Sequence, residues 1–262
     1  MTTLRELDVL RAYVRPVEYR ADSGADDRSL GVMIVRFAPF DTWYEVDSVW
    51  EGRFLERIAP GAFTKTIRES GSRVKILFNH GHDPQIGDKV LGSVLDIREE
   101  PDGPVAEVSL FDTSYNRDLL PGLRAGVYGA SFMFRPVKEE WTDAPEPSEH
   151  NPEGLPERVI REVRLFECGP VTWPANPAAT AGMRATGKMI SLTDEFYAHL
   201  RQRDPERVER LAERVGLRTP DGCAAAGAAP VSTEPAIGHS AGLTPRQRRE
   251  RLRPSLVIGG VS

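Results

Sequence analysis

The chain has 262 residues, of which 40% are hydrophobic and 28% are charged, a composition typical of a soluble globular protein. The formal net charge of −5 argues against a specific nucleic-acid-binding protein, and no apolar stretch predicts a membrane span or a secretory signal. Cys168 and Cys223 stand in unrelated contexts, so we expect no disulfide framework and a reducing, cytosolic setting.

The chain begins with polar residues and then alternates strand-like runs with turns. Residues 1–28 predict a polar, loosely held leader. Helices are expected from Ala59, over 114–126 with a break at Pro121, and after Asn176–Pro177. Short apolar runs bounded by turn signals predict strands over residues 30–40, 74–79, 89–100, 104–111, 127–137 and 159–172. These elements predict a mainly β fold with helices (α+β), namely a β-barrel surrounded by a few helices.

The character of the sequence changes after Gly187. Helix-start signals occur at Ser191 and at Asp204–Pro205, and the stretch that follows is rich in Ala, Gly, Pro and Ser. A cluster of arginines follows, for which a docking role on an acidic partner and a merely solvated tail are equally consistent. The predicted organisation is a polar leader (1–28), a folded domain (29–188), a helical extension (189–217), and a disordered linker with a basic tail (218–262).

Three of the strand-like runs carry side chains of a nucleophilic serine site. His80 follows Asn79 in the run VKILFNHGH, Ser131 lies in GVYGASFMFRP, and Glu167 lies in EVRLFECGPVTW. A hydroxyl, an imidazole and a carboxylate on separate segments are recognised as such a site by geometry and not by sequence order. Each residue also has a structural interpretation: a solvated loop histidine, a buried strand serine bonded to backbone, and a paired carboxylate.

Two neighbouring residues offer other chemistry. His82 and Asp83 complete a His-x-His-Asp pattern that is half of a metal site, but no further cluster at ligand spacing accompanies it, so zinc is not expected. Cys168 follows Glu167 and is a candidate nucleophile. A small buried core residue is the favoured interpretation of this cysteine.

Five segments in one order carry a family resemblance: FLERIAPGAF, ILFNHGHDPQIGDKVLGSV, AEVSLFDTSYNRDLL, LRAGVYGASFMF and REVRLFECGPVTWPANPAA. Over roughly residues 28–185 the chain resembles the prohead (procapsid) maturation proteases of tailed bacteriophages. That family is similar in fold to the herpesvirus assemblins. The chain departs from the usual family pattern at Met133 and at Cys168–Gly169.

The resemblance implies a serine endopeptidase domain over 29–188 that needs no cofactor. Ser131 would be the nucleophile, His80 the general base and Glu167 the third member. The implied partners are the major capsid protein, the scaffold protein and the protease itself, with possible self-association to a dimer. The implied place of action is the procapsid in the host cytoplasm. The competing interpretations are a catalytically silent scaffold or internal assembly protein, and a cytosolic hydrolase of small esters.

Overall fold

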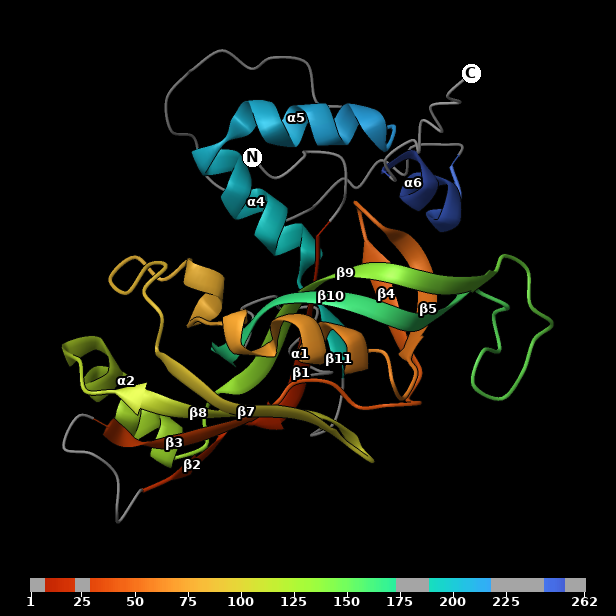
Figure 1. Ribbon diagram of the computed structural model, residues 1–262. Helices are drawn as coiled ribbons and strands as arrows, with labels where there is room; N and C mark the ends of the chain where they lie inside the picture. The colour runs from red at the N-terminus through yellow and green to blue at the C-terminus, as the bar shows by residue number, and fades with distance from the viewer. Residues whose placement is uncertain (1–7, 22–28, 173–188, 218–242, 253–262) are drawn as a thin grey trace, which may run out of the picture.

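The computed structural model describes residues 8–21, 29–172, 189–217 and 243–252. Strands make up most of its regular structure, and the helices are short (Figure 1). In chain order the elements are β1 (Val9–Pro16), β2 (Glu18–Arg20), β3 (Ser29–Arg36), β4 (Tyr44–Ser48), β5 (Gly52–Ile58), α1 (Thr64–Ser70), the 3-10 helix η1 (Gly71–Arg73), β6 (Lys75–Ile76), the 3-10 helix η2 (Asn79–Gly81), β7 (Gly92–Glu100), β8 (Gly103–Phe111), α2 (Ser114–Arg124), β9 (Gly129–Thr142), β10 (Glu157–Val171), β11 (Met189–Ser191), α4 (Thr193–Arg203), α5 (Pro205–Arg214) and α6 (Pro245–Leu252).

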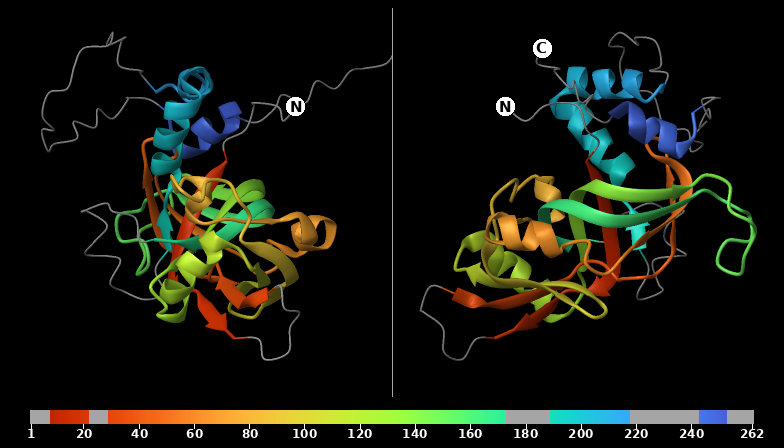
Figure 2. Two further views of the ribbon diagram at one scale, coloured as in Figure 1. Left: turned by 90° about the vertical axis from the view of Figure 1, so that its left-hand side faces the viewer. Right: turned by 45° about the vertical axis from the view of Figure 1, so that its right-hand side comes forward.

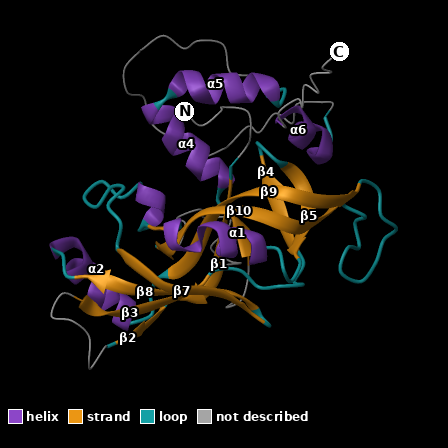
Figure 3. Cartoon of the chain, viewed as in Figure 1, coloured by secondary structure: helices purple, strands orange, loops and turns teal. Residues whose placement is uncertain are grey.

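The strands form two sheets (Figure 3). The larger sheet has seven strands in the order β11-β1-β9-β10-β5-β4, with β6 paired beside β10, and the smaller has four in the order β2-β3-β8-β7. In both views of Figure 2, α4, α5 and α6 stay together at one end of the molecule. The expected mainly β fold with helices is confirmed. A closed barrel is not, because each sheet in the described part of the chain keeps two edge strands.

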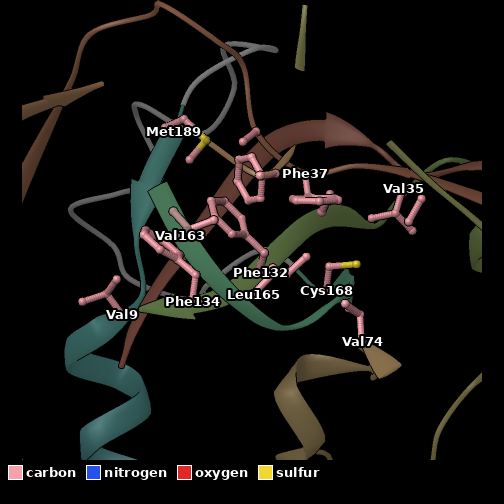
Figure 4. Close-up of a cluster of buried hydrophobic side chains, with 14 of the residues drawn as sticks. Val9, Val35, Phe37, Val74, Phe132, Phe134, Val163, Leu165, Cys168 and Met189 are labelled. Atoms are coloured by element: carbon pink, nitrogen blue, oxygen red, sulfur yellow. The ribbon is translucent and has the colours of Figure 1, made fainter. Parts of the chain in front are cut away.

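The hydrophobic core lies where β9 and β10 pack against β3 and α1 (Figure 4). Phe132 stacks on Phe134 with ring centroids 4.9 Å apart and contacts Phe37 at 5.4 Å. Leu165 and Cys168 of β10 belong to the same cluster, and Cys168 is completely buried. Burial raises the pKa of the Cys168 thiol well above its usual value. The structure therefore supports a core role for this cysteine and not a nucleophilic one.

The segment expected to be a loosely held leader contains a central strand. β1 lies between β9 and β11, with Ala12 opposite Ser131. The prediction of a polar leader over 1–28 is therefore wrong for the residues of β1 and β2. The charge of Arg11 makes β1 resemble a surface segment, yet this side chain is completely buried and its charge is paired inside the protein.

Arg11 belongs to a neutral cluster of buried charges, here called the buried charged cluster. Its Nη2 lies 2.8 Å from Glu51 Oε1, and its Nε lies 2.8 Å from Glu56 Oε1. Burial alone would raise the pKa of Glu51, but the guanidinium groups of Arg11 and Arg158 lower it to about 2. The cluster consists of Arg11, Glu51, Glu56, Glu139, Arg158 and Arg249.

Helix α6 comes from the predicted basic tail and packs on the rest of the chain. The Arg249 Nη2 donates to the carbonyl of Pro136 at 2.9 Å, and the Arg248 Nη1 donates to the carbonyl of Val49 at 2.6 Å. Arg248 and Arg249 thus bind other parts of the same chain. Both sequence interpretations, a solvated tail and a docking patch for another protein, expected these side chains to be free of such contacts. The rest of the tail, and the helix expected after Asn176–Pro177, lie outside the described residues.

Helix α1 begins at Thr64 and not at Ala59, and the predictions for α2 and β9 are wrong as well. Helix α2 continues through Pro121 without a break, because this proline is exposed and the carbonyl that it leaves unbonded, four residues earlier, belongs to the exposed Arg117. Strand β9 extends to Thr142 instead of ending at residue 137, although its last residues are charged. It continues because Glu139 is buried against Arg158 of the neighbouring strand.

The second helix of the predicted extension follows its sequence signal. The first does not, because Ser191 belongs to β11 and α4 begins after Leu192 without a side-chain cap. Asp204 accepts a hydrogen bond from the Arg207 backbone N–H at 3.1 Å and so caps α5. Val208, Leu211 and Val215 share one face of the helix, as predicted, and all three are buried. None of the helices described is long and apolar enough to cross a membrane.

The buried charged cluster generates a stability prediction. Glu56→Gln removes the charge that faces two buried guanidinium groups and should lower the free energy of unfolding by about 3–5 kcal/mol, measured by urea denaturation. Glu45→Gln is the matched control, because Glu45 is exposed and its ion pair with Arg53 lies in solvent. The control should cost less than about 1 kcal/mol. Equal losses in the two variants would contradict this description of the cluster.

Candidate active site

His80, Ser131 and Glu167, which come from three separate segments, lie in contact. The Ser131 Oγ is 2.8 Å from His80 Nε2, and His80 Nδ1 is 2.6 Å from Glu167 Oε2. Because a carboxylate only accepts hydrogen bonds, Nδ1 carries the hydrogen and Nε2 is left to accept the serine hydroxyl. The His80 and Glu167 side chains are only 6% and 4% exposed, and Ser131 is buried. The three residues therefore have the geometry of a serine triad.

The backbone of the loop that carries His80 is left-handed at two successive residues. The sequence predicts a strand over residues 74–79, but β6 contains only Lys75–Ile76. Asn79 and His80 then have φ of 45° and 56°, so the direction of the histidine comes from this turn and not from strand alternation. Asparagine is enriched in this conformation. Its Oδ1 also accepts the backbone N–H of Thr172 at 2.9 Å, which ties the loop to the end of β10.

A β-bulge in β10 sets the direction of Glu167. Leu165 lies opposite Phe134, whereas Glu167 lies opposite the very next residue of β9, so Phe166 is an extra residue in the ladder. An extra residue moves every later side chain to the other face of the strand. Leu165 therefore points into the hydrophobic core, while Glu167 lies on the face that carries Ser131.

Ser131 has a second polar neighbour on the backbone, as the structural interpretation of this serine expects, although the sequence did not indicate which carbonyl it would be. Its Oγ lies 2.8 Å from the backbone carbonyl of Arg11 in β1. A hydroxyl has one hydrogen, so Ser131 donates either to this carbonyl or to His80 Nε2. With a neutral imidazole the hydrogen is available to Nε2. With a protonated imidazole, Nε2–H donates to Oγ and the hydroxyl donates to Arg11.

Gly169 allows β10 to approach the segment that carries the histidine. A Cβ added at Gly169 would lie 2.0 Å from the carbonyl oxygen of Leu77, a distance that real Cβ atoms do not show. Leu77 is three residues before His80, so this backbone contact sets how near the histidine loop lies to the strand of Glu167. The sequence signal was a glycine inside a strand, which often marks close backbone approach.

His82 lies outside the triad. Its ring stacks on His199 of α4 with centroids 4.8 Å apart. Burial, with smaller contributions from His199 and His80, lowers the pKa of His82 to about 4. Among the residues that the structure describes, no group of His, Cys, Asp and Glu side chains is arranged to hold a metal ion. The contact with Ser131 thus distinguishes His80 from His82.

Comparisons with known proteins place the site in a family context. Residues 25–191 match the family described as caudovirus prohead serine protease. Among solved structures, the capsid assembly protease of bacteriophage T4 is similar, with 11% sequence identity and a TM-score of 0.31 over 57% of this chain and 100% of that chain. No curated protein matches the chain. His80, Ser131 and Glu167 all lie within the matched residues.

The Gly169 contact predicts a loss of reactivity without a matching loss of fold. Gly169→Ala should move the His80 loop by about 1 Å or more and slow labelling of Ser131 by a fluorophosphonate by about a hundredfold. Gly61→Ala is the control, because it destabilises the fold through a different cause, the positive φ of 86° at Gly61, while its Cβ has room. The midpoint temperature of thermal unfolding should fall in both variants. Labelling of Gly169→Ala at the wild-type rate would show that this contact does not position the histidine.

Proposed function

Because the chain belongs to the caudovirus prohead serine protease family, we propose that His80, Ser131 and Glu167 are the catalytic triad with which it matures phage proheads. The proposed substrates are the scaffold protein or the scaffold segment of the major capsid protein, and the protease itself. The observation that carries the assignment is the unbroken hydrogen-bonded series from Ser131 through His80 to Glu167, at 2.8 and 2.6 Å.

The geometry supports hydrolysis through an acyl-enzyme. His80 Nε2 accepts the hydroxyl proton as Ser131 Oγ attacks the scissile carbonyl, and then gives this proton to the leaving amine. A water molecule next attacks the ester while His80 takes its proton; the bond between the acyl carbon and Ser131 Oγ breaks, and His80 returns the proton to Oγ as the acid product leaves. Glu167 Oε2 holds the imidazole by Nδ1 and stabilises the imidazolium formed in each step. Every proton passes between groups on this chain, the substrate and water.

The Arg11 carbonyl contacts the serine of the free enzyme, since the acylated Ser131 has no hydroxyl hydrogen. When His80 is protonated, Nε2–H has a partner in Ser131 Oγ, and the hydroxyl hydrogen has one in the Arg11 oxygen. The resting serine is therefore hydrogen-bonded in both protonation states of the histidine. A strand from the N-terminal part of the chain thus contributes to the environment of the nucleophile.

Three finer expectations belong to this proposal. Proteolysis would take place inside the procapsid, in the host cytoplasm, on proteins enclosed with the enzyme. Self-association to a dimer stays a prediction, which sedimentation of the purified chain tests. A kinship of fold with the herpesvirus assemblins also stays a prediction, supported by the sheet-dominated architecture with peripheral helices.

The alternative of a catalytically silent scaffold protein is not favoured. A purely structural protein gains nothing from a buried histidine held between a serine and a carboxylate. The left-handed residues that orient His80 carry a conformational cost, which is common where a side chain must be aimed for function.

Loss of the nucleophile should abolish proteolysis and leave the fold intact. Ser131→Ala should lower turnover by on the order of a million-fold, because members of a triad act as a unit. Intact mass of the purified chain, alone and mixed with the major capsid protein of the same phage, measures the cleavage. Ser93→Ala, an exposed serine on β7, is the control and should cleave like the wild type. Discrete fragments that persist in Ser131→Ala would refute the assignment.

A further inference from the structure

A pocket of about 430 Å³, here called the side pocket, lies beside the loop that carries His80. This volume is within the range of sites that bind small ligands or single side chains. Several of its lining residues are exposed, so it communicates with solvent. The side chains that characterise it are Phe78, Asp83, Lys89, Tyr115, Asp118 and Tyr128.

The side pocket shares its walls with the segments that carry the triad. Asn79, which lines it, directly precedes His80, and Thr172, which also lines it, follows β10 and is hydrogen-bonded to Asn79 at 2.9 Å. Tyr128 lies three residues before Ser131 and directly precedes β9. The walls of the side pocket are therefore continuous along the chain with the segments that carry His80 and Ser131.

The walls of the side pocket are apolar and aromatic. Phe78 is buried and packs edge to face against Tyr128, with ring centroids 5.4 Å apart. Leu119 of α2 adds an aliphatic surface, and Tyr115 adds a second phenol ring. Such walls suit the methylene stem of a long side chain, and ring faces attract a cationic head group.

The charges of the side pocket are negative in sum. Asp83 is held in place because its Oδ1 accepts the backbone N–H groups of Gln85 at 2.9 Å and Ile86 at 2.8 Å. Asp118 is exposed on α2. The opposing charge is Lys89, whose Nζ lies over the ring of Tyr115 at 5.6 Å from its centroid. Two carboxylates against one ammonium group favour a positively charged occupant.

We propose that the side pocket binds a lysine or arginine side chain of the substrate, close to the scissile peptide bond. This inference rests on the proposed function, which supplies the peptide. The stem of the side chain lies against Phe78 and Tyr128, and its head group meets Asp83 and Asp118. Substrates with a basic residue at this position are cleaved in preference to substrates with an acidic one.

Cleavage of peptides that differ at single positions tests the specificity. The wild type should cleave peptides with one lysine or arginine near the bond at least about tenfold faster than those with glutamate there. Asp118→Asn should reduce this ratio about tenfold, and Asp118→Lys should invert it. Asp47→Asn, an exposed carboxylate on β4 outside the pocket, should leave the ratio unchanged. The inference would be overturned if the ratio were the same in the wild type and both Asp118 variants, or if the wild type cleaved the glutamate peptides faster.

A binding measurement separates this inference from the proposed function. N-acetyl-arginine methylamide should shift the NMR signals of Tyr115 and Tyr128 in the full-length Ser131→Ala chain, which cannot cleave. N-acetyl-glutamate methylamide should not shift them, and Asp118→Asn should weaken the response to the arginine probe. Failure of the arginine probe to shift these signals at millimolar concentration would overturn the pocket assignment. If the arginine probe binds but the wild type cleaves none of the peptides, the proposed protease activity would be refuted instead.

Discussion

The pairing of β9 with β10 is the constraint on which the candidate site depends, because it carries Ser131 and Glu167 on adjacent strands. A regular ladder would turn Glu167 towards the core beside Leu165, where a charge without a partner costs several kcal/mol. The bulge at Phe166 moves the carboxylate to the face of Ser131, and there it meets His80 at 2.6 Å. One extra residue in a strand thus keeps the core apolar and completes the triad.

On its other side, β9 is held by β1, and the buried charged cluster holds β1. Arg11 acts at two levels: its guanidinium pairs with Glu51 and Glu56, and its carbonyl lies 2.8 Å from the serine oxygen. Since breaking a buried ion pair costs several kcal/mol, the position of this carbonyl is tied to the stability of the whole sheet. Arg11 therefore contributes both to the free energy of unfolding and to the surroundings of Ser131.

The sequence was sufficient to name the three residues of the proposed triad, which the structure brings into contact, and most strands. It was insufficient for the directions of these side chains and strands. Runs such as residues 104–111 show β-branched residues between turn signals, so local preference predicts the strand. The bulge at Phe166 and the left-handed turn at Asn79 depend on pairing with distant strands. Local pattern does not contain this information. β1 and α6 were missed for a related reason: Arg11 and Arg249 look solvated until their buried partners are known.

The most direct measurement is fluorophosphonate labelling of the full chain, with the adduct located by peptide mass mapping. We expect a single adduct on Ser131 and labelling slower by on the order of a hundredfold or more in Glu167→Gln. Glu162→Gln, which alters a carboxylate earlier in β10 that binds Lys65, should label like the wild type. An adduct on another residue, or equal rates in wild type and Glu167→Gln, would contradict the claim that the bulge completes a catalytic triad.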